Sequence, residues 1–368
     1  MSRRRARPSP LYLLLLLLVA VVLGLYQAGY LGWLGLSPRA PVVQAPAGTW
    51  FQVYFTAPDP ADAAVHSGGI DARVAADIDA AQQSVDIASF DLDLQSIARA
   101  LLQAHQRGVQ VRLVIDDENL ADETVLQTTR ELSSAGIPIV YDRRQAFMHN
   151  KFVVIDRRVV WLGSWNLTDN DTYRNNNNFL RLELPPLAEN YTREFEEMFL
   201  EQAFGPRSPQ NTPYPTLLLD DGTRIETHFA PEDDPRSAIL EALERSKTEI
   251  LFMAFSFTDE EIARQLIEKA RSGVVVRGVL EARNAAAESS VYDLFQKAGL
   301  DVRLDGNPRV MHHKVFVIDS RVTITGSFNF TRSAAQENDE NLVIIENADL
   351  ARAYREEFER VYRVGKTE

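Results

Sequence analysis

The chain contains no cysteine in its 368 residues, so disulfides and thiolate metal sites are excluded in any compartment. Histidine is also scarce, and no HExxH pair or other familiar ligand cluster occurs. We therefore expect metal-independent chemistry, with neither a metal nor another cofactor. The chain has these histidines: His66, His105, His149, His228, His312 and His313.

Positive charge is in short supply. The formal net charge is −13, and residues 1–40 hold five arginines and no acidic residue, so the rest carries 34 of the 39 basic residues against all 52 acidic ones. A nucleic-acid-binding protein gains much of its affinity by neutralising phosphates with a basic face. The balance therefore disfavours a dedicated nuclease, although it does not exclude a local basic groove.

The N-terminus has the pattern of a membrane segment. Residues 11–36 contain no charged side chain and follow Arg3, Arg4, Arg5 and Arg7. Such a stretch exceeds the roughly 20 residues that span a bilayer. The arginines predict a cytoplasmic N-terminus, an anchor in the inner membrane and an extracytoplasmic body. The alternative is a cleaved signal peptide and a secreted body, with Ala45-Pro46-Ala47 as the cleavage site, but that site lies far from the leucine run.

Beyond this leader the chain repeats itself. Ile97-Ala98-Arg99 matches Ile262-Ala263-Arg264, and Ala135-Gly136 matches Ala298-Gly299, with an offset of 163 to 165 residues. Proline-rich stretches precede each copy and are typical of linkers. The predicted organisation is an anchor (1–36), a linker (37–48), a first repeat (49–205), a second linker (206–221) and a second repeat (222–368).

Each copy alternates apolar strands with amphipathic helices. In the first, strands are expected at residues 85–90 and 109–115 with a helix at 94–106 between them; the second repeats the order. Strand-helix-strand order favours parallel pairing. We therefore expect an α/β protein of two pseudo-twofold-related repeats, each a mostly parallel mixed β-sheet flanked by helices on both faces, plus an N-terminal hydrophobic helix.

The most informative pattern occurs once in each copy. A histidine, any residue and a lysine are followed by four residues, an aspartate, six residues, and then glycine, serine, an aromatic residue and asparagine. Two copies with identical spacing are not chance. Each His-x-Lys precedes one short strand and each Gly-Ser follows the next, so a hairpin brings the motif ends together, and the pseudo-twofold faces the two motifs across a cleft. The members are His149, Lys151, Asp156, Gly163, Ser164 and Asn166, then His312, Lys314, Asp319, Gly326, Ser327 and Asn329.

This doubled motif resembles the signature of the phospholipase D superfamily, over roughly residues 50–364, and suggests a bacterial phospholipase D-like or cardiolipin synthase-like, membrane-anchored member. The resemblance implies that both copies build one active site. The residue types fit phosphodiester cleavage: one histidine attacks phosphorus to form a phosphohistidine, and the other protonates the leaving oxygen and then activates water. The expected donors to the phosphate oxygens are Lys151, Lys314, Ser164, Asn166, Ser327 and Asn329.

Other motif residues are expected to be structural. Asp156 and Asp319 each follow a buried strand and should stabilise a turn. Gly163 and Gly326 belong to the same structural frame. His313 points to the opposite strand face from its neighbours and should be structural as well.

The two copies differ at one position. By the family pattern, a carboxylate thirteen residues after the motif serine orients the histidine; the second copy has Glu340 there, and the first has Asn177. If each partner serves its own copy, Glu340 keeps His312 protonated as the general acid. His149, beside the neutral Asn177, is then the nucleophile.

The expected function is a phospholipase D-type phosphodiesterase that hydrolyses the distal phosphodiester of a phospholipid at a membrane surface. The products are phosphatidic acid and the free head group, and an alcohol acceptor would give transphosphatidylation. No obligate protein partner is evident.

Three alternatives stay open. One is a metal-independent endonuclease of the same superfamily, for which nucleic acid would be the substrate; the second is a cardiolipin synthase-type phosphatidyltransferase, although that type generally has a longer membrane-embedded N-terminus. The third is a non-catalytic binding scaffold, which the intact motifs argue against. The nuclease would need a basic groove, for which loop arginines are available at Arg143, Arg144, Arg157, Arg158 and Arg174.

Overall fold

The computed structural model of the protein describes residues 42–44, 50–56, 58 and 67–366. The predicted anchor, residues 1–36, lies outside the described residues, as does most of the predicted linker 37–48. Within the described ranges, no helix is both long enough and apolar enough to cross a membrane.

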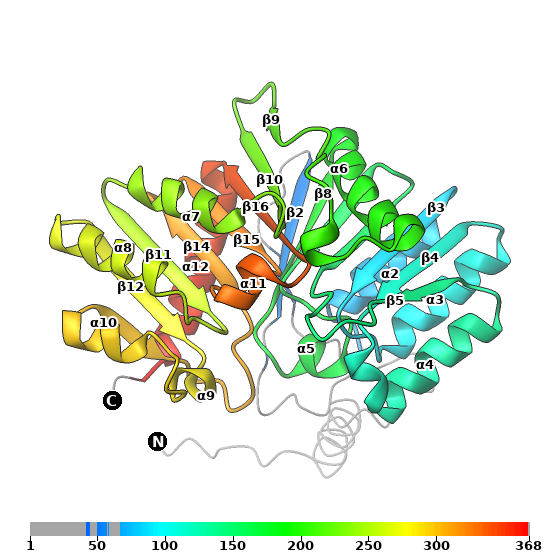
Figure 1. The fold of residues 1–368 in the computed structure, drawn as a ribbon, viewed down its shortest axis with the longest axis horizontal. Helices are drawn as coiled ribbons and strands as arrows, with labels where there is room; N and C mark the ends of the chain where they lie inside the picture. Colours follow the sequence, from blue (N-terminus) through cyan, green and yellow to red (C-terminus); the bar gives the residue numbers. More distant parts are fainter. Residues whose placement is uncertain (1–41, 45–49, 57, 59–66, 367–368) are drawn as a thin grey trace, which may run out of the picture.

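Two eight-stranded sheets share one strand order, which is the structural counterpart of the sequence repeat (Figure 1). The first sheet runs β1 (Val42–Gln44), β2 (Phe51–Thr56), β8 (Asn178–Glu183), β7 (Val159–Gly163), β6 (Lys151–Ile155), β3 (Ser84–Ser89), β4 (Gln110–Ile115), β5 (Ile139–Tyr141). The second runs β9 (Thr216–Leu218), β10 (Arg224–Ala230), β16 (Glu340–Glu346), β15 (Val322–Gly326), β14 (Lys314–Ile318), β11 (Glu249–Ala254), β12 (Val275–Leu280), β13 (Asp301–Leu304).

The sheets are mixed, and the prediction that they are mostly parallel is wrong. Only β3-β4-β5 and β11-β12-β13 are parallel; every other neighbouring pair is antiparallel. Strand-helix-strand order holds only for the first half of each unit. In the second half, short connections such as the turn between β6 and β7 return the chain directly, and a direct return gives antiparallel pairing.

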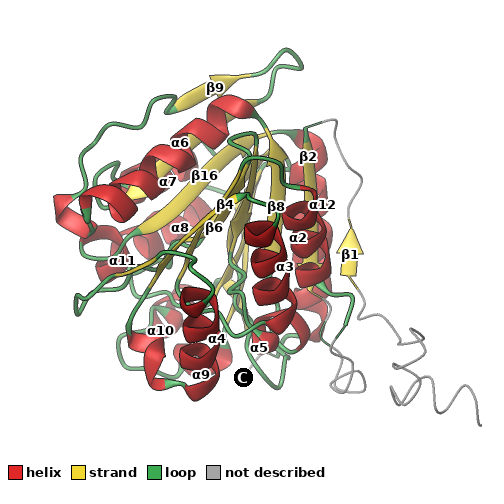
Figure 2. Ribbon diagram, turned by 90° about the vertical axis from the view of Figure 1, so that its right-hand side faces the viewer, coloured by secondary structure: helices red, strands yellow, loops and turns green. Residues whose placement is uncertain are grey.

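Helices cover both faces of each sheet, as expected (Figure 2). One apolar cluster combines residues of both sheets with α6 and α12, so these two helices and the inner sheet faces join the units. Separate clusters hold the outer helices against each sheet. The helices are α2 (Ile70–Ala80), α3 (Gln95–Gln106), α4 (Glu123–Ser134), α5 (Asp169–Tyr173), α6 (Pro185–Glu196), α7 (Pro235–Glu244), α8 (Glu260–Arg271), α9 (Ala282–Ala285), α10 (Tyr292–Ala298), α11 (Arg332–Gln336) and α12 (Ala348–Val364).

Local sequence explains these elements well. In α8 the Asp259 carboxylate accepts hydrogen bonds from the N–H groups of Glu261 and Ile262, which satisfies two of the unpaired donors at a helix start. Ile262, Leu266 and Ile267 recur at helical spacing on the buried face. Each such side chain contributes about 1.5–3 kcal/mol on burial. Strand β9 lies inside the stretch predicted as the second linker and pairs with β10.

Candidate active site

The repeated motif forms the hairpin that its spacing predicts. Lys151 and Lys314 are the first residues of β6 and β14, and each histidine lies two residues earlier. Strands β6 and β7 are antiparallel neighbours, as are β14 and β15. Gly163 and Gly326, which end β7 and β15, therefore lie beside the strand starts that carry the histidines.

The motif aspartates accept hydrogen bonds from the backbone at the starts of two central strands. The Asp156 carboxylate accepts hydrogen bonds of 2.7–3.1 Å from the backbone N–H groups of residues 82–84. The Asp319 carboxylate does the same for residues 247–249 at 2.7–2.9 Å. Each aspartate thus ties the far end of its hairpin to the start of a central strand, β3 or β11, away from the histidines.

The motif glycines are required by close backbone packing. At Gly163, where φ is 155°, an added Cβ would lie 2.4 Å from the carbonyl oxygen of Asn178. At Gly326, where φ is 151°, it would lie 2.1 Å from the carbonyl oxygen of Asn341. Only a residue without Cβ fits either position.

The two units exchange backbone hydrogen bonds at the histidines. The His149 N–H donates to the Asp339 carbonyl of the second unit at 2.9 Å, and the His312 N–H donates to the Asn176 carbonyl of the first unit at 2.8 Å. Parallel bridges between Met148 and Asp339 and between Asn176 and Met311 flank these bonds. Each histidine is therefore positioned by the opposite unit.

This exchange overturns the predicted pairing of the histidines. Nδ1 of His149 lies 2.7 Å from Oε2 of Glu340, and Nδ1 of His312 lies 3.0 Å from Oδ1 of Asn177. Glu340 serves His149, not His312, because the cross-unit pairing places the residue after Asp339 beside His149. The spacing within one motif does not reveal a partner that arrives from the other.

The motif serines hold these partners in place. The Ser164 hydroxyl donates to Oδ1 of Asn177 at 2.8 Å, and the Ser327 hydroxyl donates to Oε2 of Glu340 at 2.7 Å. Both serines are fully buried. Their protons are engaged in positioning the groups that touch the histidines, and a direct phosphate contact stays a prediction.

Asn166 and Asn329 are partly buried, and the side-chain oxygen of each is buried without a hydrogen-bond partner. Within the described residues, no protein group donates a hydrogen bond to either oxygen. Their predicted role in binding phosphate is untested. His313, by contrast, is buried between Asn178 and Glu357, at 3.0 and 2.9 Å, and is a structural residue as expected.

Both motif lysines are buried beside their own histidines. Nζ of Lys151 donates to the His149 carbonyl at 3.0 Å, and Nζ of Lys314 donates to the His312 carbonyl at 2.9 Å. Burial lowers the pKa of Lys151 to about 8. Burial and the charge of Lys151 lower the pKa of Lys314 well below its usual value. Both therefore hold their protons less firmly than a lysine in water.

The histidines and lysines share one electrostatic environment. Burial first, then the charges of Lys151 and Lys314, lower the pKa of His149 well below its usual value. The same causes lower the pKa of His312 to about 4, with Asp171 opposing them. Burial raises the pKa of Glu340 to about 8 against the opposing charge of Lys151. Burial thus disfavours the charged form of both imidazoles in the free site.

Sequence matches in both units show the family of the chain. Residues 74–199 and 239–362 each match the family model described as "Cardiolipin synthase, PLD-like domain", and together they cover more than half of the chain. The chain belongs to this phospholipase D-like family. Each match contains one copy of the motif, so the site at the unit interface is the doubled phospholipase D-like site.

Curated relatives match over about a third of the chain. The human mitochondrial cardiolipin hydrolase is 38% identical over 126 residues, which are 34% of this chain and 50% of that protein. A phospholipase D of Rickettsia felis is 36% identical over 132 residues, 36% of this chain and 66% of that protein. The chain thus spans half to about two thirds of the length of these relatives.

A solved structure shares the two-unit fold. The phosphatidylserine synthase of Haemophilus influenzae Rd KW20 superposes with a TM-score of 0.65 over 89% of each chain, at 13% identity. At that identity the likeness concerns the fold.

Two phenylalanines of the phospholipase D-like site escaped the sequence analysis. Phe90 packs against His149 with ring centroids 5.0 Å apart, and its ring lies 5.1 Å from Nζ of Lys151. Phe255 packs against His312 at 4.6 Å and against Nζ of Lys314 at 4.6 Å. Each directly follows a buried strand at the repeat offset, which was the signal that could have revealed them.

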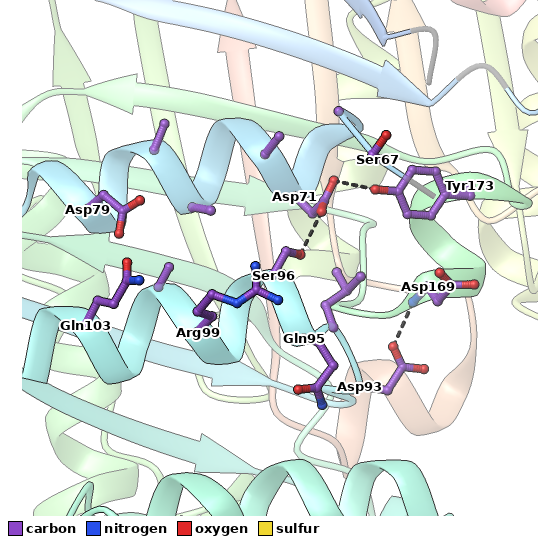
Figure 3. Close-up of a pocket in the computed structure, with 16 residues that line it drawn as sticks. Ser67, Asp71, Asp79, Asp93, Gln95, Ser96, Arg99, Gln103, Asp169 and Tyr173 are labelled. Carbon is purple, nitrogen blue, oxygen red and sulfur yellow. Dashed lines mark hydrogen bonds between the residues drawn. The ribbon is translucent and has the colours of Figure 1, made fainter. Parts of the chain in front are cut away.

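One hollow on the surface lies away from the histidines. A groove of about 760 Å³ between α2 and α3 is lined by Asp71, Arg99 and Asp169 but by no motif residue (Figure 3). Asp71 accepts hydrogen bonds there from Ser96 and Tyr173. The groove therefore belongs to the outer helices and not to the phospholipase D-like site.

One carboxylate cluster in the described part of the chain has the spacing of a metal site. Glu194, Glu197 and Glu232 offer oxygens within 4.8 Å of one another. Burial raises the pKa of Glu197 and of Glu232 to about 7 and that of Glu194 well above its usual value. Burial thus favours the protonated form of these three carboxyl groups.

Proposed function

We propose that the protein is a phospholipase D-type phosphodiesterase that cleaves the distal phosphodiester of phospholipids through a phosphohistidine. The observation that carries the proposal is the site itself: two buried histidines meet at the unit interface, each with Nδ1 held by the opposite unit and each beside a buried lysine. These are the groups that attack phosphorus, protonate a leaving oxygen and balance phosphate charge.

His149 is the proposed nucleophile. With its Nδ1 proton directed at Glu340, the lone pair of Nε2 attacks phosphorus, a P–N bond forms and the P–O bond to the head group breaks. The imidazole of the adduct carries positive charge, which favours the ionised form of Glu340 despite its raised pKa, and the carboxylate then stabilises the adduct. The sequence predicts the same histidine, but from the wrong premise that Asn177 lies beside it.

His312 is the proposed general acid. The anionic phosphate between the lysines favours the protonated imidazole, which offsets the low pKa of about 4 in the free site. His312 passes its proton to the leaving head-group oxygen. It then takes a proton from water, whose oxygen attacks phosphorus, so that the P–N bond breaks and phosphatidic acid leaves.

The arginines support a lipid over a nucleic acid. Arg144 is ion-paired with Asp142 and Asp339. Arg157 and Arg158 lie on the β6–β7 turn, at the edge opposite the histidines. Of the five arginines that a nuclease groove would use, one is therefore engaged by carboxylates and two lie away from the histidines. The names of the relatives, phospholipase D and cardiolipin hydrolase, point to lipid as well.

The proposal includes the membrane anchor. Residues 1–36 would hold the extracytoplasmic body at the bilayer and so keep the site close to its substrate.

Transfer to an alcohol is the second candidate, favoured by the match to a family described by cardiolipin synthase. The same intermediate serves both outcomes, because an alcohol oxygen in place of water would yield a new phosphodiester. Added ethanol then distinguishes transfer from hydrolysis.

The test compares lipid with nucleic acid on the full chain in detergent with EDTA. Release of choline, ethanolamine or glycerol from vesicles is measured beside cleavage of single-stranded DNA and RNA. His149→Ala and His312→Ala are the blanks, and His105→Ala on α3 is the matched control. We expect head-group release that both blanks lose and the control keeps. Cleavage of nucleic acid alone would contradict the proposal.

A further inference from the structure

The two units carry their active-site carboxylates at different positions. Counted from the motif serine, the seventh and thirteenth residues are Asp171 and Asn177 in the first unit but Ala334 and Glu340 in the second. Each unit thus has one carboxylate and one neutral residue, in exchanged order.

The seventh positions are structurally equivalent. Asp171 lies in α5 and Ala334 in α11, both five-residue helices. Each helix begins with a threonine whose hydroxyl accepts a 3.2 Å hydrogen bond from this residue, Thr168 from Asp171 and Thr331 from Ala334. The carboxylate of Asp171 and the methyl group of Ala334 therefore occupy equivalent positions in the two units.

In the second unit one side chain does two tasks. Glu340 accepts the Ser327 hydroxyl at 2.7 Å, and the same oxygen, Oε2, lies 2.7 Å from Nδ1 of His149. It fixes the ring and places a carboxyl group directly against it. The amide of Asn338 points at its other oxygen at 3.4 Å.

In the first unit these tasks are divided. Asn177 accepts the Ser164 hydroxyl and holds Nδ1 of His312 at 3.0 Å, while Oδ2 of Asp171 lies 3.4 Å from the same nitrogen. Asn175, the equivalent of Asn338, donates to Asp171 at 2.6 Å. In both units, the amide eleven residues after the motif serine thus contacts the carboxylate of that unit.

Asp171 carries charge despite its location. It is 3% exposed, and burial opposes its ionisation, but the charge of His312 and hydrogen bonds from His312, Asn175 and the Asn166 N–H lower its pKa below the usual value. A buried carboxylate in contact with an imidazole favours the protonated ring.

We propose that Asp171 is the positioning residue of His312, replacing from α5 the carboxylate that the second unit carries at Glu340. This inference rests on the proposed function, in which His312 is the general acid. Asn177 fixes the orientation of the His312 ring, and Asp171 stabilises the charge that the ring carries before it protonates the leaving group.

The first test is Asp171→Asn, which keeps a side-chain oxygen for the Asn166 N–H. We expect kcat to fall about tenfold or more, a fraction of what general acid catalysis contributes, with KM little changed. The charged groups that act on His312 are Lys314, Lys151 and Asp171. Removing the one anion lowers the pKa of His312, so the basic limb of the kcat profile moves to lower pH.

The second test transplants the arrangement of the second unit. Asp171→Ala should lose activity like Asp171→Asn, and the double variant Asp171→Ala with Asn177→Glu should regain most of it. Asp169→Asn on the same helix is the matched control. A double variant that keeps the wild-type melting temperature but stays as slow as Asp171→Ala would overturn the exchange.

A readout without turnover separates this inference from the proposed function. The His312 imidazole is titrated by NMR with inorganic phosphate present, and its resonance is assigned with His312→Asn. We expect Asp171→Asn to lower the pKa of His312. If Asp171→Asn changes neither the His312 titration nor kcat while His149→Ala still loses activity, the role of Asp171 is refuted and the proposed function is not. If His149→Ala stays active, the proposed function fails, and the NMR titration still decides whether Asp171 acts on His312.

Discussion

The two units place their histidines at equivalent positions and surround them differently. His149 has one close carboxylate, Glu340, at 2.7 Å, whereas His312 has an amide at 3.0 Å and a carboxylate at 3.4 Å. The scaffold is symmetric to the level of strand order, but the proposed reaction needs one nucleophile and one acid. A few polar residues on a repeated frame are enough to make two equal positions chemically unequal.

The largest expected effect on kcat comes from replacing each histidine in turn. Both His149→Ala and His312→Ala should lose at least about a thousandfold in kcat on phospholipid. A phosphodiester with a p-nitrophenol leaving group needs little protonation, so His312→Ala should still form the phosphoryl-enzyme while His149→Ala should not. The measurement is the amount of phosphoryl label that stays on the protein after quenching and is then released by acid, as expected of a phosphohistidine. Label on His312 in the His149→Ala variant would reverse the assignment.

Loss of the lysine charges at high pH should have a smaller effect, on the KM for phospholipid. Lys151, with a pKa of about 8, carries its charge below pH 8 and loses it as pH rises through that value, and Lys314 shares the trend. Since the charged form binds phosphate, we expect KM to rise about tenfold between pH 7 and 9. Initial rates on vesicles over this range test it. A flat KM would show that bound substrate is not held by these charges.

The smallest effect on activity should come from the turn aspartates, which the two units use alike. Asp156→Ala and Asp319→Ala each remove an ionised acceptor of three backbone N–H groups, and each should lower the free energy of unfolding by about 2 kcal/mol. Hydrogen bonds from these N–H groups lower the pKa of both carboxyls, although burial opposes the shift. This stabilisation is therefore present at neutral pH and is lost as pH falls through the folded pKa.

Urea unfolding of both variants beside wild type measures this loss, with kcat as the control. Equal losses would confirm that the turns are symmetric. A large drop in kcat at unchanged stability would give one of these aspartates a role in chemistry.

Local features of the fold and site could be predicted from sequence. The spacing from His149 through Asp156 to Gly163 dictates the hairpin, and the capped pattern after Asp259 dictates α8, because neighbours in sequence determine both. The parallel direction assigned to most strands failed where a short turn replaces a helix. Residues 1–36 lie outside the described residues, so the anchor stays a prediction.

Partners that arrive from another part of the fold could not be predicted. Glu340 reaches His149 only because the units dock through the bonds at Asp339 and Asn176. Asp171 reaches His312 from a helix that has no carboxylate in the other copy. Such contacts depend on how packed faces meet, which motif spacing does not encode.

The bonds between His149 and Asp339 and between His312 and Asn176 have one more consequence. Neither half of the chain supplies both a histidine and the residue that holds its Nδ1, so neither has a complete histidine site on its own. Correct docking of the two units is therefore a condition for assembling the site.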